Sequence, residues 1–302
     1  MPVARVLLLS VLAALGLLAE RGEAARVRVV ASLPDLKALT EAVGGDLVEV
    51  DSLARGPQNP HDVEVRPSLM LKLRRADLLV RNGAGGDPWV EPLLLGAQNA
   101  RIMPGAPGYV DASRGVAILA PAAVDRSRGD VHPEGNPHYT LDPLNAGPVT
   151  ASILEGLVRV APQHAERFQA RRADFLARLE QALAGWQAAL APVRGAPVVS
   201  YHETFTYFFR RFGLVQAGVI EDRPGIPPSP SHLAALVRLI REQNVRVIVA
   251  EPYADRSVVE WLARETGARA LTLPAAVGGG RGTDTYLDLI DYQVRALARA
   301  LQ

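Results

Sequence analysis

Near the middle of the 302-residue chain lies the stretch QHAERFQARRADFLARLEQALAGWQAAL, residues 163–190. It contains no proline and only one glycine, Gly185. From Leu176 onward its apolar residues recur every three or four positions, as one face of an α-helix requires. Such a helix would be roughly 40 Å long at about 1.5 Å per residue. The stretch therefore predicts a helix long enough to run the length of two domains.

Short β-branched strands alternate with helices on both sides of this stretch. Strands are expected at residues 27–32, 48–53, 77–81 and 100–103, with a short one at 116–119, and then at 197–201, 214–219, 245–250 and 270–273. This rhythm predicts βαβ units with mainly parallel sheets. We therefore expect an α/β fold of two parallel-sheet lobes joined by the long helix. The expected parts are a signal peptide (1–25), a first lobe (26–161), a linking helix (162–192) and a second lobe (193–302).

The N-terminus has the pattern of a secretory signal peptide. Arg5 precedes an apolar run from Val6 to Leu18, and small residues stand at Ala24-Ala25. The run is shorter than the roughly 20 residues that span a bilayer, although an uncleaved anchor is the alternative. The sequence has no cysteine, so we expect neither disulfides nor a lipid-modified cysteine. These features predict an exported, periplasmic protein without a lipid anchor.

Composition and motifs argue against several classes of function. The formal net charge of +1 gives no indication of a nucleic-acid partner. The sequence contains no Gly-x-Ser-x-Gly elbow, no His-Glu-x-x-His helix, no phosphate-binding loop and no thiol nucleophile. The Gly278–Gly282 run lacks the strand–loop–helix spacing of a nucleotide site and is interpreted as a flexible loop.

Three of the six histidines share one setting. His61 and His138 each end an Asn-Pro-His triplet, and His202 follows a predicted strand in Ser-Tyr-His-Glu. After His138, Asp142 is expected to cap a helix and Pro143 to begin it. Loops at the carboxyl ends of parallel strands are where α/β sheets bind ligands. Neutral imidazole is the commonest protein ligand for transition metals, so the three histidines predict a metal site.

Zinc prefers four ligands, so three histidines require a fourth group. Asp284, which follows the Gly-rich loop, is the best placed candidate. Glu203 and Glu251 are the alternative candidates for this fourth ligand. His132 lies in the weakly patterned loop 105–135, and its role is left open. The candidate ligands are too scattered in the sequence to form a local motif.

Seven motifs spread along the chain make a resemblance specific. They are NPHDVEVRPS (59–68), NPHYTLDP (136–143), YHETFTYF (201–208), PGIPPS (224–229), EP (251–252), ETG (265–267) and TDTYLD (283–288). In this order the chain resembles the solute-binding proteins of zinc and manganese ABC transporters, the group with a rigid helical backbone. The resemblance implies a metal receptor that serves a membrane permease, not an enzyme, and we expect a monomer.

The resemblance also implies the ligands and the metal. The family's four ligand positions match His61, His138, His202 and Asp284, so the metal would lie in the cleft between the lobes and draw them together slightly. Three imidazoles and one carboxylate suit Zn²⁺. Members associated with manganese tend to carry a carboxylate where this chain has His202, which favours zinc over Mn²⁺. Residues 121–134 lack the His-rich loop of many zinc-selective members.

Three alternatives stay open at this point. The same scaffold could serve manganese or iron. A zinc hydrolase with three histidine ligands would use Asp284 as a general base. A surface adhesin is disfavoured because no lipid anchor is expected.

Overall fold

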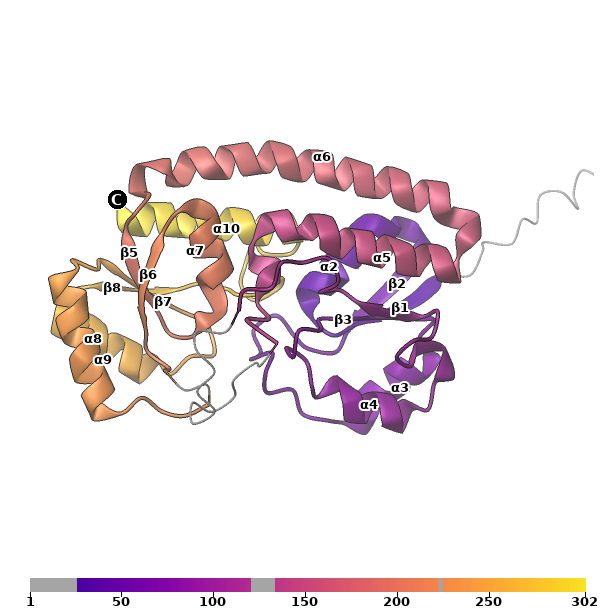
Figure 1. The fold of residues 1–302 in the computed structure, drawn as a ribbon, viewed down its shortest axis with the longest axis horizontal. Coiled ribbons are helices and arrows are strands. Elements are labelled where there is room, and N and C mark those ends of the chain that lie inside the picture. The colour runs from indigo at the N-terminus through magenta and orange to yellow at the C-terminus, as the bar shows by residue number, and fades with distance from the viewer. Residues whose placement is uncertain (1–25, 121–133, 223–224) are drawn as a thin grey trace, which may run out of the picture.

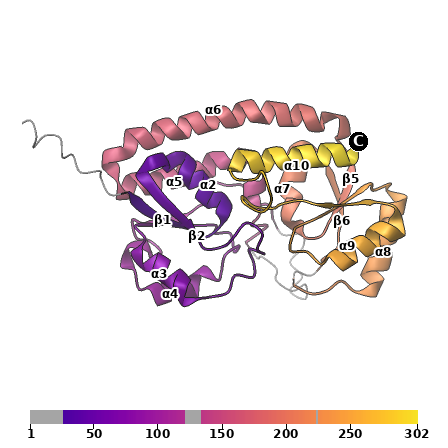
Figure 2. The same ribbon diagram turned by 180° about the vertical axis from the view of Figure 1, so that it is seen from behind.

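The computed structural model describes residues 26–120, 134–222 and 225–302 (Figure 1). The predicted signal peptide (1–25) and His132 lie outside the described residues. The described chain forms two α/β lobes that lie side by side beneath one long helix (Figures 1 and 2).

The first lobe contains a four-stranded parallel sheet in the order β2-β1-β3-β4. Its strands are β1 (Val27–Ala31), β2 (Val48–Ser52), β3 (Leu78–Arg81) and β4 (Tyr109–Asp111). Its helices are α2 (Pro34–Gly44), α3 (Pro67–Arg75), α4 (Val90–Ala97) and α5 (Ala146–Val160). The central strands are almost wholly buried, as their β-branched and leucine side chains predict.

Two strand predictions in this lobe were wrong. Residues Ala100–Ile102 form a 3₁₀ turn, because the side-chain oxygen of Asn99 accepts a hydrogen bond from the backbone N of Arg101. The amide of Asn99 donates to the carbonyls of Leu73 and Ala76, which fixes the turn against the end of α3. The fourth strand is β4 instead, and residues 116–119 form no strand.

The second lobe repeats the arrangement of the first. Its parallel sheet has the order β6-β5-β7-β8, with β5 (Pro197–Ser200), β6 (Val215–Val219), β7 (Val247–Ala250) and β8 (Arg269–Thr272). Its helices are α7 (Thr206–Phe212), α8 (Pro230–Glu242), α9 (Arg256–Thr266) and α10 (Tyr286–Leu301). Ser229 caps α8 by accepting a hydrogen bond from the backbone N of His232, and Pro230 occupies the first helical turn.

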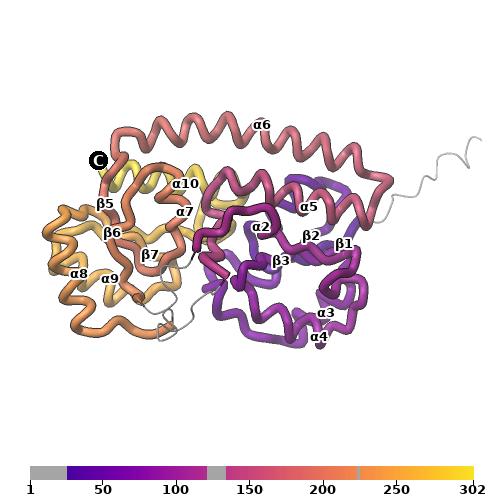
Figure 3. The backbone as a smooth tube through the Cα atoms, in the orientation of Figure 1, coloured from indigo at the N-terminus to yellow at the C-terminus, as the bar shows by residue number. Residues whose placement is uncertain are grey.

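The predicted long helix is present as α6 (Ala165–Leu190), which runs along both lobes (Figure 3). It packs against α2 and α5 of the first lobe and against α10 of the second. Its buried residues are Phe168, Phe175, Leu179, Trp186 and Leu190. The indole N–H of Trp186 donates to Asp291 on α10 at 3.2 Å. One apolar face of α6 thus joins the two lobes. The residue boundaries between the lobes and the linking helix stay predictions.

Side chains near the junction also tie the lobes together. Asp142 caps the turn Pro143–Asn145, as predicted, and both of its carboxylate oxygens accept hydrogen bonds from Arg211 on α7 at 2.7 and 2.8 Å. The hydroxyl of Tyr286 on α10 donates to the carbonyl of Thr140 at 2.6 Å. Among the described residues, no helix has both the length and the apolar character that a membrane crossing needs.

Candidate metal centre

His61 lies on the loop that follows β2. Its backbone N donates to the side-chain oxygen of Asn59 at 3.1 Å, which closes a tight Asx turn. The indole of Trp89 donates to the carbonyl of Pro60 at 2.8 Å. The loop is therefore held from within by the asparagine and from outside by the tryptophan.

His138 is held in the same way on the loop before α5. Its backbone N donates to the side-chain oxygen of Asn136 at 2.9 Å. Asn82, at the end of β3, donates to the carbonyl of Pro137 at 3.1 Å, and Tyr139 donates to the carbonyl of Asn82 at 2.6 Å. The repeated Asn-Pro-His triplet therefore encodes two equivalent turns, and the second is fastened to the end of the sheet.

His202 follows β5 in the second lobe and is buried, at 8% exposure. The backbone N of Tyr201 donates to the carbonyl of Val249 at 2.7 Å, so the sheet pairing reaches the residue before His202. In the order β6-β5-β7-β8 the chain runs from β5 to β6 on one side and then crosses over to β7 on the other side of β5. Such a switch point is where α/β sheets bind ligands.

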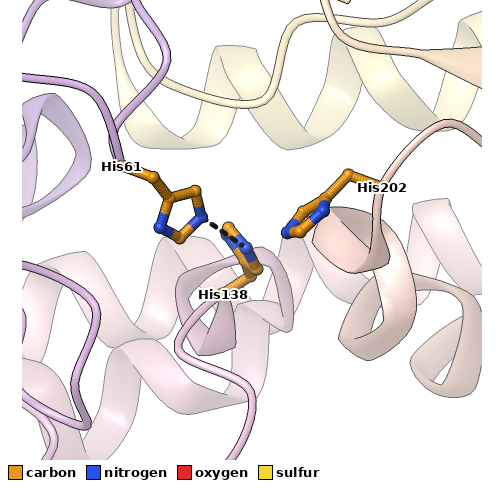
Figure 4. Close-up of side chains that lie close together, drawn as sticks. All are labelled: His61, His138 and His202. Carbon is orange, nitrogen blue, oxygen red and sulfur yellow. Dashed lines mark hydrogen bonds between the residues drawn. The ribbon is translucent and has the colours of Figure 1, made fainter. Parts of the chain in front are cut away.

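The three imidazoles converge from the two lobes (Figure 4). One ring nitrogen from each lies within 4.8 Å of the others. The Nε2 atoms of His61 and His138 are 3.1 Å apart, and the ring centroids are separated by 4.9 to 5.5 Å. Nitrogens bound to one tetrahedral zinc at 2.0–2.1 Å would be roughly 3.3 Å apart. A shift of about 1.5 Å or less in any pair would therefore give ligand geometry.

Acidic groups surround His202. Its Nδ1 donates to Oε2 of Glu221 at 2.9 Å. Burial lowers the pKa of His202, but the hydrogen bond to Glu221 and the charges of Glu251, Glu221 and Glu203 outweigh it, so the pKa is raised. Burial raises the pKa of the Glu251 carboxyl, which the positive charge of His202 opposes. Neither carboxylate oxygen of Glu251 has a hydrogen-bond partner among the described residues. The surroundings favour a cation at His202.

Asp284 lies outside the histidine cluster and is exposed. It follows the loop Gly278–Thr283, which closes through a 2.7 Å hydrogen bond from Gly278 N to Thr283 O. This loop contacts the one that carries His61, since a Cβ on Gly56 would lie 2.3 Å from the carbonyl carbon of Gly278. The fourth ligand therefore stays a prediction. Of the two alternative candidates for the fourth ligand, Glu203 is exposed and Glu251 is fully buried.

An open cavity of about 290 Å³ adjoins the cluster. Residues of both lobes line it, among them His61 and Asp62 from the first and Tyr201, His202 and Glu221 from the second. His61 and His202 therefore face one cavity. Glu221 was not predicted from the sequence, where it is marked only as an acidic residue two positions after the end of β6.

The family model of the zinc-uptake complex component A, periplasmic (ZnuA), matches residues 29–300. The chain belongs to this family. Its members are solute-binding receptors for metal transport and not enzymes, which excludes the hydrolase alternative.

Relatives extend over most of the chain. The high-affinity zinc uptake system protein ZnuA of Bacillus subtilis (strain 168) is 25% identical over 285 residues, which cover 91% of this chain and 88% of the relative. ZnuA of Paracoccus denitrificans (strain Pd 1222) is 28% identical over 330 residues, with 96% of each chain covered. The zinc-binding protein AdcA of Streptococcus pyogenes serotype M6 is 25% identical over 267 residues and 84% of this chain. The chain spans only about half of AdcA, 51%.

Solved structures share the two-lobed fold. A crystal structure of ZnuA superposes with a TM-score of 0.78 at 26% identity and covers 92% of this chain and 100% of its own. The solute-binding protein FpvC of Pseudomonas aeruginosa, in complex with Mn²⁺, has a TM-score of 0.79 at 26% identity, with coverage of 92% and 99%. FpvC is also known in complex with Ni²⁺. Proteins of this fold thus bind more than one divalent metal.

Proposed function

We propose that this protein is the periplasmic receptor of an ABC importer, which captures Zn²⁺ between its lobes and delivers it to the membrane permease. His61, His138, His202 and Asp284 would hold the ion. The observation that carries the proposal is the convergence of three imidazoles from two lobes. The ion is cargo, so the chemistry is binding and release.

The ligand set supports zinc as the cargo. Zinc accepts imidazole and carboxylate in a tetrahedron, whereas manganese prefers carboxylate, carbonyl and water oxygens. The zinc names of the Bacillus and Paracoccus relatives agree with this choice. Copper and nickel would also bind imidazole, so the selectivity of transport would depend on geometry and metal supply.

Capture would require only a small closure of the lobes. Helix α6, the Asp142–Arg211 pair and the Tyr286–Thr140 hydrogen bond all oppose a wide opening. The loop before Asp284 would then make the larger movement and bring the carboxylate to the ion. The receptor would act as a monomer after export, with no nucleic-acid partner.

Competition between zinc and manganese for chelator-stripped protein tests this function. We expect one tightly bound zinc per chain that excess manganese does not displace. In His202→Glu the preference should shift toward manganese, because a carboxylate replaces an imidazole. Manganese binding by the unmutated protein that equals or exceeds zinc binding would contradict the choice of cargo.

A further inference from the structure

Glu221 and His202 are held side by side by the sheet of the second lobe. Beyond the last paired residues of β5 and β6, Ile220 N donates to Ser200 O at 2.9 Å and Glu221 N donates to Tyr201 O at 2.8 Å. The backbone pairing thus continues up to the residue before His202. The distance between the two side chains is therefore set by regular backbone structure.

Both carboxylate oxygens of Glu221 are engaged. Oε2 accepts the hydrogen bond from Nδ1 of His202 at 2.9 Å, and Oε1 accepts one from the backbone N of Gly225 at 2.9 Å. The two side chains are largely buried, with 10% exposure for His202 and 16% for Glu221. A carboxylate only accepts hydrogen bonds, so Nδ1 of His202 must carry a proton. In the neutral imidazole the free lone pair is then on Nε2.

We propose that Glu221 is a positioning residue for metal capture, which holds His202 in the tautomer and ring orientation that offer Nε2 to the ion. This inference rests on the proposed function. Histidines that bind metals commonly donate their second ring N–H to a carboxylate, and loss of such a partner typically weakens metal binding 10- to 100-fold. Glu221 itself is not among the groups whose atoms converge with the three histidines.

A double-mutant cycle with zinc as the probe tests this role. Glu221→Ala and the nearly isosteric Glu221→Gln are compared with the unmutated protein by competition with chelators of graded affinity. We expect Glu221→Ala to weaken zinc binding 10- to 100-fold. In a His202→Ala background the same change should have an effect of less than about twofold, because the imidazole that Glu221 positions is gone. In a His61→Ala background the full loss should remain.

Two further readouts separate positioning from general damage. Asp222→Asn removes a carboxylate from the next, exposed position and should leave zinc affinity unchanged. Bound Co²⁺ should show shifted visible absorption bands in Glu221→Gln, since the orientation or basicity of one ligand changes. Thermal unfolding of each stripped variant establishes that it is folded.

The outcomes also distinguish this inference from the function on which it rests. If the unmutated protein binds zinc and His202→Ala weakens it, but Glu221 variants bind normally, only the inference is overturned. A loss that persists undiminished in the His202→Ala background also overturns it, because Glu221 would then act as a ligand itself. If the unmutated protein does not bind zinc, or His202→Ala binds it normally, both proposals fall.

Discussion

Asp35, in the first turn of α2, lies where the two lobes meet. Its Oδ1 accepts a hydrogen bond from the backbone N of Val277 at 2.7 Å, and its Oδ2 accepts one from the hydroxyl of Thr140 at 3.0 Å. Burial raises the pKa of Asp35 from 3.8 to about 6, although both hydrogen bonds oppose the rise. The folded protein therefore retains this proton over a pH range in which the unfolded chain has lost it.

Asp35→Asn should change how stability depends on pH. Below about pH 4 Asp35 is protonated in both the folded and the unfolded state of the unmutated protein, so its titration does not change the free energy of unfolding there. Between about pH 4 and 6 only the unfolded state releases it, and the free energy of unfolding falls by about 3 kcal/mol. The Asp35→Asn variant should lack this fall in the free energy of unfolding, because asparagine does not titrate. Urea unfolding of both stripped proteins at several pH values measures it, and parallel pH profiles would contradict the assignment.

Asp284→Ala tests the fourth ligand, which the structure leaves outside the cluster. If the carboxylate reaches the ion on closure, zinc affinity should fall at least about tenfold, the smallest loss typical of groups that merely support a ligand. Glu265→Ala, on the surface of α9, is the matched control because it removes an exposed carboxylate away from the site. Calorimetric titration of stripped protein measures both, and equal affinities would exclude Asp284.

The residues of the site differ in how far the sequence could predict them. His61 and His138 were predictable because each Asn-Pro-His triplet encodes its own turn. In each turn the asparagine side chain accepts a hydrogen bond from the backbone N of the histidine two positions later. His202 could be predicted because it follows a predicted strand, at the end of a parallel sheet where ligands bind. Glu221 is 19 residues from His202 along the chain, and their contact exists only because β5 and β6 pair. No local pattern encodes that pairing.

Helix α6 contains one glycine, Gly185, that lowers its stability. Gly185 lies in the interior of the helix, is exposed, and an added Cβ would meet nothing within 4 Å. Gly185→Ala should therefore stabilise the protein by about 0.5–1 kcal/mol, because glycine loses more backbone entropy in a helix than alanine. Chemical denaturation measures the gain. Gly213→Ala, whose φ of 73° favours glycine, should destabilise instead, and the opposite ordering would contradict this account.

Elements were predictable where their signal was periodic and local. The amphipathic pattern of α6 and the apolar strands gave the α/β rhythm of both lobes. The three-residue strand β4 was missed because Pro107 and Gly108 precede it, and its register is fixed by pairing with Leu79, Val80 and Arg81. The polar contacts of Asn99 made a turn where a strand was expected.

For the whole molecule, the essential feature is that the candidate ligands belong to different lobes. His61 and His138 lie before α6 in the chain and His202 lies after it, yet their rings are neighbours. The sequence predicted two lobes and a long helix, but the distance between the histidines depends on how α6, α2 and α10 pack. If the ion bridges the lobes, it should stabilise them as one unit, and the thermal midpoint should rise with free zinc.

Zinc titration of stripped protein with single-histidine variants tests the central claim most directly. The account predicts one zinc per chain for the unmutated protein, and loss of tight binding and of the thermal shift in both His61→Ala and His202→Ala. His164→Ala, beside the start of α6 and outside the cluster, should behave like the unmutated protein. If either His61→Ala or His202→Ala kept tight zinc binding and the full thermal shift, an ion shared between the lobes would be contradicted.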